Sequence, residues 1–202
     1  MAGSITSRRQ GLTKGDQRER ALLDAARALF REKPIGEVAI DELTGAAGIT
    51  RSSFYFYFES KRALLAALCD QAVGETDDEM AEWLASDGPN RDALRRGLAR
   101  SLARWRIDGR WLRELFIAPD PGQDILSVRE RLITSSGSAL CDRIRRDARA
   151  GRTVGGVPEQ LASMVIGLRV MTLSELYALP GTYTDDELLD GLTDAILRLI
   201  YG

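Results

Sequence analysis

The chain has 202 residues, of which 44% are hydrophobic and 29% are charged, and it contains no histidine. This composition is ordinary for a folded globular protein with its own core, and it argues against disorder. The two cysteines, Cys69 and Cys141, are far apart, so the sequence can assemble neither a zinc site nor a Cys-His or Ser-His-Asp catalytic arrangement. A glycine-rich phosphate loop is also absent. We therefore expect no enzyme activity, no metal site and no cofactor.

Charge is distributed unevenly along the chain. Residues 1–62 hold 11 Lys and Arg against 8 Asp and Glu, whereas the remainder holds 17 against 22. We expect residues 1–15 to form a flexible basic arm that reaches along DNA, the alternative being a disordered terminus without a role. The longest apolar run, residues 164–173, is interrupted by Gly167 and Arg169 and is too short to span a membrane. We therefore expect a cytoplasmic protein without a membrane anchor.

Three helices are predicted in the basic N-terminal part. Apolar residues at helical spacing indicate helices over residues 16–33 and 41–47, the second ended by Gly48. A tight turn then leads into a third helix that carries five consecutive aromatic residues, at positions 54–58. Two short helices joined by a glycine-containing turn, after a longer helix, are the helix-turn-helix arrangement.

The third helix carries side chains suited to DNA. Because a helix turns about 100° per residue, Phe54 and Phe58 share one face and belong to the core. Hydroxyls and a guanidinium spread around the other faces, and such groups bond phosphate oxygens and base edges. These candidate DNA-binding residues are Thr50, which is placed to cap the helix, Arg51, Ser52, Ser53, Tyr55 and Tyr57. An aromatic cluster that packs a helix corner is the alternative.

The rest of the chain also has the helical period. The predicted helices cover residues 60–84, 90–107 and 110–118, a long segment containing 125–144, and residues 158–179 and 185–201. Asp108-Gly109 is expected to separate two of them, because both residue types disfavour a helix interior. With the first three helices this makes about nine, with no strand signal, so we expect an all-α fold.

The last two predicted helices suggest a homodimer. The helix over 158–179 is apolar on nearly all sides, and the helix over 185–201 has a continuous apolar stripe. Pairing these two helices with their copies in a second subunit would bury both surfaces. Burial within one chain is the alternative.

The C-terminal helices also contain the residues expected to line a pocket for a small ligand. Aromatic and methionine side chains suit a large, mostly apolar ligand, and a few polar groups would orient it. The candidates are Trp105, Trp111, Phe116, Met164 and Met171, with Arg169 and Thr172 as polar anchors. A plain core role for each of them is the alternative.

Residues 38–65 resemble the DNA-binding domain of the TetR family of bacterial transcription regulators. The motifs that carry the resemblance are Ala47-Gly48-Ile49-Thr50, Tyr55, Tyr57-Phe58 and Lys61. A resemblance to the ethionamide-resistance repressor branch rests on the run Phe54-Tyr55-Phe56-Tyr57-Phe58, on Glu159-Gln160-Leu161-Ala162-Ser163 and on Ile200-Tyr201-Gly202.

The resemblance implies a homodimer that binds a palindromic operator, usually as a repressor, and leaves it when a small molecule enters the C-terminal domain. It implies an arm over 1–15, a helix-turn-helix domain over 16–62 and a ligand-binding and dimerisation domain over 63–202. By position, Arg51, Ser52 and Tyr55 would face base edges, while Thr50, Ser53, Tyr57 and Lys61 would hold phosphates. A helical ligand-binding or scaffold protein without operator binding is the alternative.

Several positions depart from the family pattern. Asp41 stands where some relatives have a basic residue that reads bases, so we expect no base contact from the second helix. Ile166 and Arg169 stand where relatives of that branch place ligand-contacting asparagines. We therefore expect ligand recognition to differ here.

Overall fold

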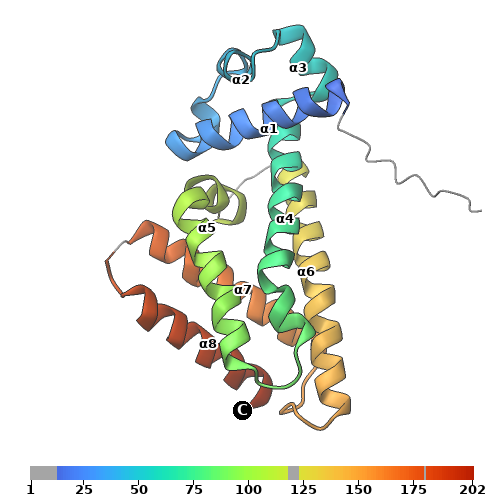
Figure 1. The fold of residues 1–202 in the computed structure, drawn as a ribbon, viewed down its shortest axis with the longest axis vertical. Helices are drawn as coiled ribbons and strands as arrows, with labels where there is room; N and C mark the ends of the chain where they lie inside the picture. The colour runs from blue at the N-terminus through green and yellow to red at the C-terminus, as the bar shows by residue number, and fades with distance from the viewer. Residues whose placement is uncertain (1–12, 118–122, 180) are drawn as a thin grey trace, which may run out of the picture.

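Eight α-helices and one short 3-10 helix make up the regular structure in a computed structural model that describes residues 13–117, 123–179 and 181–202. Within these ranges no strand is present, so the all-α prediction is confirmed. The helices are α1 (Lys14–Glu32), η1 (Ile35–Glu37), α2 (Ile40–Ala47), α3 (Arg51–Tyr57), α4 (Lys61–Ala85), α5 (Arg91–Ile117), α6 (Gln123–Arg149), α7 (Pro158–Ala178) and α8 (Asp185–Tyr201). Helices α1 to α3 form a head at one end of a body made by α4 to α8 (Figure 1).

The head is a helix-turn-helix unit built on α1. The side chains of Leu22, Leu43 and Phe54 are fully buried and bring one helix each into a shared core. Gly48 ends α2 with φ +65°, a left-handed conformation that favours glycine, and this turn directs the chain into α3. Helix α1 begins at Lys14, so the end of the predicted arm is helical, whereas residues 1–12 lie outside the described part of the chain.

Helix α5 runs without interruption through Asp108-Gly109, so the predicted break was wrong and the helix count is one lower than expected. Asp108 is only 1% exposed, and its two carboxylate oxygens accept hydrogen bonds from Arg27 and Arg31 of α1. Gly109 lies so close to the ring of Tyr177 in α7 that a Cβ atom at residue 109 would overlap that ring. An ion pair and a close ring contact therefore place two poor helix formers in the middle of a long helix.

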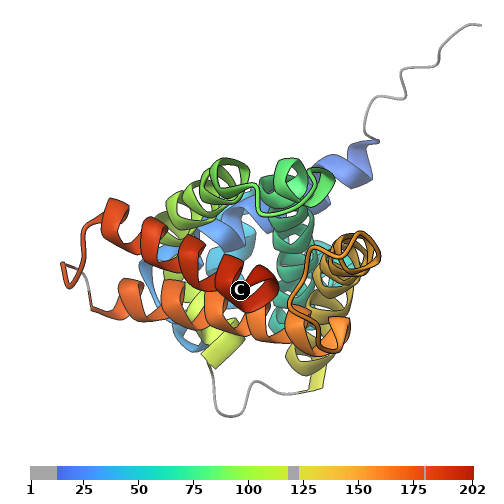
Figure 2. The same ribbon diagram turned by 90° about the horizontal axis from the view of Figure 1, so that it is seen from below.

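The body is a bundle of the five helices α4 to α8. Helix α4 packs against α5 and α6, and α7 packs against α5, α6 and α8. The arginine-rich face of α5 is held by acidic residues of its neighbours, for example Arg95 by Asp190 of α8 and Arg96 by Glu82 of α4. Seen from below, α7 and α8 lie side by side along one side of the body (Figure 2).

A buried polar network closes the end of the body that is remote from the head. The guanidinium of Arg143 in α6 lies 4.4 Å from the ring centroid of Trp83 and donates to the Gly88 carbonyl oxygen at 2.6 Å. The Tyr201 hydroxyl, at the end of α8, accepts from Arg143 at 3.2 Å and donates to Asp147 at 2.6 Å. Arg143 and Asp147 are both fully buried. This network joins the C-terminus to α6 and to the connection between α4 and α5.

Helix α7 presents an apolar face to solvent. Met164 and Met171, two turns apart, are 55% and 49% exposed. In the most apolar 18-residue stretch of α7 only 28% of the residues are buried, and by length and composition alone this helix could cross a membrane. The apolar stripe of α8, in contrast, packs against other helices of the same chain, since Leu188, Leu192 and Ile196 are all buried. One of the two predicted interface helices therefore has an uncovered apolar face.

Candidate DNA-binding surface and effector cavities

Helix α3 begins at a side-chain cap. The Thr50 hydroxyl accepts a hydrogen bond from the Ser53 backbone N–H at 3.2 Å and also lies 2.9 Å from the hydroxyls of Ser52 and Ser53. An N-cap of this kind satisfies one of the backbone donors that a helix leaves free at its first turn. The hydroxyls of Thr50, Ser52 and Ser53 therefore lie close together at the N-terminal end of α3.

The aromatic residues of α3 divide into a buried and an exposed set. Phe54 and Phe58 are buried, with ring centroids 6.2 Å apart, whereas Tyr55 is 47% and Phe56 is 82% exposed. Tyr57 is intermediate and packs against the head's core. Phe56 was not among the predicted site residues. The helical period contains the signal for it, because residue 56 lies about 200° around the helix from both buried phenylalanines.

Arg51 is the exposed cation of α3, and α2 supplies its partner. The Asp41 carboxylate accepts a hydrogen bond from the Arg51 guanidinium at 2.8 Å, and both side chains are mostly exposed. This hydrogen bond raises the pKa of Arg51. Asp41 was expected to prevent base reading from α2, and the structure adds a second effect, namely that it orients the guanidinium of α3.

Lys61 lies at the start of α4 with its ammonium turned toward the head. Its Nζ atom donates to the carbonyl oxygens of Val38 at 2.7 Å and Gly36 at 3.1 Å. Partial burial lowers the pKa of Lys61. Two of its three donors hold the segment between α1 and α2, so only one donor is left for the predicted phosphate contact.

Ion pairs join the head to the body. Arg27 of α1 forms a bidentate pair with Glu75 of α4, at 2.6 and 2.8 Å, and also donates to Asp108 of α5 at 3.0 Å. Arg31 donates to the same aspartate at 2.6 Å. Burial by itself would raise the pKa of Asp108, but hydrogen bonds from the two arginines hold that pKa below its usual value. We call these four residues the head–body junction.

Described residues of the body line three cavities. Two are inner cavities of about 30 and 20 Å³, and Thr76 and Arg169 line both of them. The third, of about 350 Å³, opens between α5, α7 and the segment before α8, and Trp105 lines it as well as the smaller inner cavity. Over the described residues no group of His, Cys, Asp and Glu side chains is arranged to hold a metal ion.

The predicted ligand-binding residues are only partly brought together. Trp105, Phe116 and Arg169 line the smaller inner cavity, where the two aromatic rings stack with centroids 6.1 Å apart. The others line none of the three cavities: Trp111 is fully buried, Met164 and Met171 are on the outer face of α7, and Thr172 is partly exposed there. Residues that the sequence did not single out, among them Trp83, Leu94 and Leu98, line the larger inner cavity.

Comparison with known proteins identifies the head. Residues 22–68 match the sequence model of a family described as "Bacterial regulatory proteins, tetR family". The HTH-type transcriptional regulator EthR from Mycolicibacterium smegmatis is 42% identical over 94 residues, which cover 45% of this chain and 42% of that relative. The chain therefore aligns with less than half the length of this relative.

The whole fold also has counterparts. A tetR-family transcriptional regulator from Streptomyces coelicolor superposes with a TM-score of 0.74 at 22% identity, over 94% of this chain and 82% of that chain. FadR from Bacillus subtilis, solved in complex with stearoyl-CoA, has a TM-score of 0.74 at 14% identity, over 90% of this chain and 99% of that chain. At such identities the likeness concerns the fold. The match to the TetR family model lies in residues 22–68, where it agrees with the predicted resemblance.

Proposed function

We propose that the protein is a cytoplasmic repressor that binds a palindromic DNA operator as a dimer and leaves it when a small, largely apolar ligand enters the body. The observation that carries this proposal is the division of α3 into two faces. Phe54 is fully buried in the head, while Arg51, Tyr55 and Phe56 project into solvent. A guanidinium and a phenol can bond base edges, and an exposed phenyl ring can contact a thymine methyl group.

The uncovered face of α7 supports the dimer. An apolar surface that includes Met164 and Met171 is costly in water, and pairing it with a second copy would bury it. Two heads held by such a pairing would occupy successive major grooves, about 34 Å apart along the DNA. Each α3 would then meet one half of the palindrome.

The junction and the cavities support release by a ligand. Helix α5 carries Asp108 at the head–body junction and, on either side of it, Trp105 and Leu112 in the wall of the smaller inner cavity. The inner cavities have about the volume of one water molecule each, so a ligand with several carbon atoms must push the helices apart. A ligand that moves α5 changes the position of the head, and one that discriminates between two head positions shifts their populations.

A footprint on the DNA that flanks the protein's own gene tests the function directly. We expect protection of a palindrome, with affinity falling by on the order of 10³-fold between about 50 and 200 mM salt as phosphate contacts are lost. The purified protein and quantitative DNase protection at both salt concentrations are sufficient. Absence of sequence-selective binding to any fragment of the genome in a selection experiment would instead favour a ligand-binding or scaffold protein.

Substitutions in α3 test which residues read the sequence. We expect Arg51→Ala and Tyr55→Ala each to lower the discrimination between operator and random DNA by about 1 to 3 kcal/mol, since each removes one base contact. Competition gel shifts with a scrambled operator measure this difference. Arg62→Ala is the matched control, because it removes an exposed positive charge just outside α3 and should weaken binding to both DNAs alike. Unchanged discrimination in both α3 variants contradicts the assignment.

A further inference from the structure

Arg169 is a charged side chain beside the two inner cavities of the body. It lies on the inner side of α7 and lines both inner cavities. Among the residues that the structure describes, no hydrogen bond or ion pair reaches its guanidinium. Burial lowers the pKa of Arg169 to about 10, so the group is still charged at neutral pH. A partly buried guanidinium with five unused donors is unfavourable unless something else satisfies it.

A second arginine, Arg104, lines the smaller inner cavity together with Arg169, and its guanidinium does have hydrogen-bond partners. Arg104 of α5 donates to the Ala72 carbonyl oxygen at 2.7 Å and to the Thr76 hydroxyl, and it pairs with Glu79 at 3.0 Å. Glu79 also accepts from the Ser101 hydroxyl at 2.6 Å. Glu79 is therefore already engaged by other side chains, and the second carboxylate whose charge acts on Arg169 is that of Asp77 in α4.

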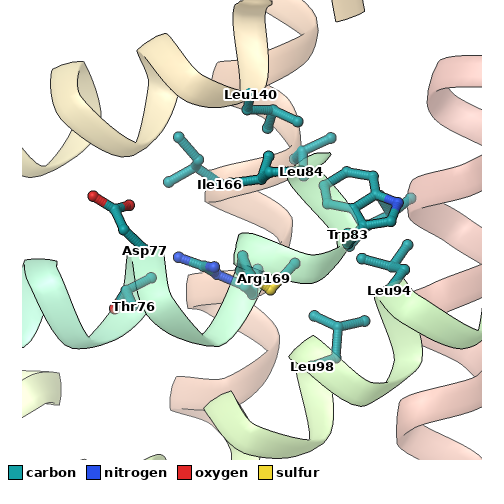
Figure 3. A pocket seen from close by; sticks show the side chains of 12 residues that line it. Thr76, Asp77, Trp83, Leu84, Leu94, Leu98, Leu140, Ile166 and Arg169 are labelled. Atoms are coloured by element: carbon teal, nitrogen blue, oxygen red, sulfur yellow. The ribbon is translucent and has the colours of Figure 1, made fainter. Parts of the chain in front are cut away.

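The surroundings of Arg169 are apolar in two directions. Figure 3 shows its side chain reaching from α7 toward the turn of α4 that carries Thr76 and Asp77, with Trp83, Leu94 and Leu98 on the other side of the cavity. On the far side of Arg169, Trp105, Leu112 and Phe116 line the smaller cavity. The guanidinium thus lies between two hydrophobic walls. Helices α4 and α5 contribute to the wall of the larger inner cavity, and α5 and α7 contribute to that of the smaller one.

We propose that Arg169 anchors the carboxylate of an effector that is a carboxylic acid with an apolar chain. A carboxylate matches a guanidinium in a planar, bidentate geometry and would occupy donors to which the described residues offer no hydrogen bond. A phosphate dianion would leave one negative charge unbalanced in an apolar site. The chain of the acid would extend along either apolar wall, displacing α7 from α4, the helix that carries the head. This assignment of the effector rests on the proposed regulatory function.

Calorimetric titration of the full-length protein with dodecanoate, dodecanamide and dodecylamine, below their critical micelle concentrations, tests the proposal. Octanoate and decanoate extend the series to shorter chains. We expect the acid to bind on the order of 10- to 100-fold more tightly than the amide, which is the gain of a charge-assisted over a neutral contact, and the amine to bind least. In Arg169→Gln the preference for the acid should disappear, and Arg169→Lys should retain part of it.

The matched control is Arg106→Gln, since Arg106 is the arginine that lines the large outer cavity. Its substitution should leave the acid preference unchanged. Equal affinity of the wild-type protein for acid and amide, no binding of any of the three acids, or loss of the preference in Arg106→Gln but not in Arg169→Gln would each overturn the proposal.

Thermal unfolding without ligand tests the proposal independently of which acid is chosen as the probe. Arg169→Met should raise the midpoint of thermal unfolding, because it removes an unsatisfied charge from an apolar site, whereas a structural role would make the variant less stable. Operator affinity of Arg169→Gln without ligand should equal that of the wild-type protein. If the wild-type protein binds no operator, the proposed function fails, but acid selectivity at Arg169 is still decided by the titrations.

Discussion

The double substitution Met164→Glu, Met171→Glu is expected to convert the proposed dimer to a monomer and to abolish the proposed operator binding at concentrations where the wild-type protein would saturate the site. Both side chains lie on the exposed apolar face of α7, so the substitutions would bury four unpaired carboxylates in the dimer. Without the dimer each head binds alone, and the loss of linkage lowers apparent operator affinity by on the order of 10²- to 10⁴-fold.

Sedimentation velocity and gel shifts on the same samples measure both effects. The control is Ala81→Glu, which introduces the same charge at an exposed position of α4 and should change neither the mass of the particle nor its operator affinity. A variant that stays dimeric with both glutamates present would show that the dimer does not use this face of α7.

Asp147→Asn is expected to lower the free energy of unfolding by about 3 to 5 kcal/mol, the effect of removing one partner of a buried ion pair. Asp147 and Arg143 are both fully buried, and Asp147 accepts hydrogen bonds from the Tyr201 hydroxyl at 2.6 Å and from the Gly88 backbone N–H at 3.2 Å. Without the carboxylate the guanidinium remains buried and loses its counter-charge. Urea denaturation at neutral pH measures the difference.

The same residue gives a pH signature. Burial by itself would raise the pKa of Asp147, but the hydrogen bond from Tyr201 and the charge of Arg143 hold it below the usual value. A depressed folded-state pKa contributes stability that is present above about pH 4, the unfolded value, and is lost as the pH falls through the folded value. This part of the acid destabilisation should be absent in Asp147→Asn. Asp142→Asn, an exposed position on the same helix, should cost at most about 1 kcal/mol; equal losses in the two variants would contradict the prediction.

Local signals predicted the head well. Each signal there involves only a few neighbouring residues: the glycine at position 48, the cap at Thr50, and the spacing of Phe54 and Phe58. The structure places each of them as expected. The predicted break at Asp108-Gly109 was wrong because it ignored contacts with distant parts of the chain. Helix propensity describes a residue in isolation, whereas Asp108 is held by Arg27, which is 81 positions away in the chain.

The candidate site was predicted unevenly. The hydroxyls and the guanidinium of α3 follow from residue type and helical period. The sequence did not show that the Lys61 ammonium donates to the carbonyl oxygens of Gly36 and Val38, which leaves one of its three donors for the predicted phosphate contact. From the sequence, the aromatic and methionine residues of the body were all equally good candidates for lining a pocket. The fold puts Trp105 beside cavities and turns Met164 to solvent, because the side of a helix that becomes the interior depends on which helices pack against it.

The sequence by itself determined that the chain is all-helical, that its N-terminal part ends in a helix-turn-helix with an aromatic third helix, and that it lacks the residues for zinc or triad chemistry. These properties depend on residue types and on spacings within one or two helical turns. Only the tertiary structure decided that one face of α7 is uncovered, that α1 is tied to α5 through Asp108, and that Arg169 lies between two cavities without a hydrogen bond or ion pair from the described residues. Each of these depends on contacts between helices far apart in the chain, and no local pattern encodes such contacts.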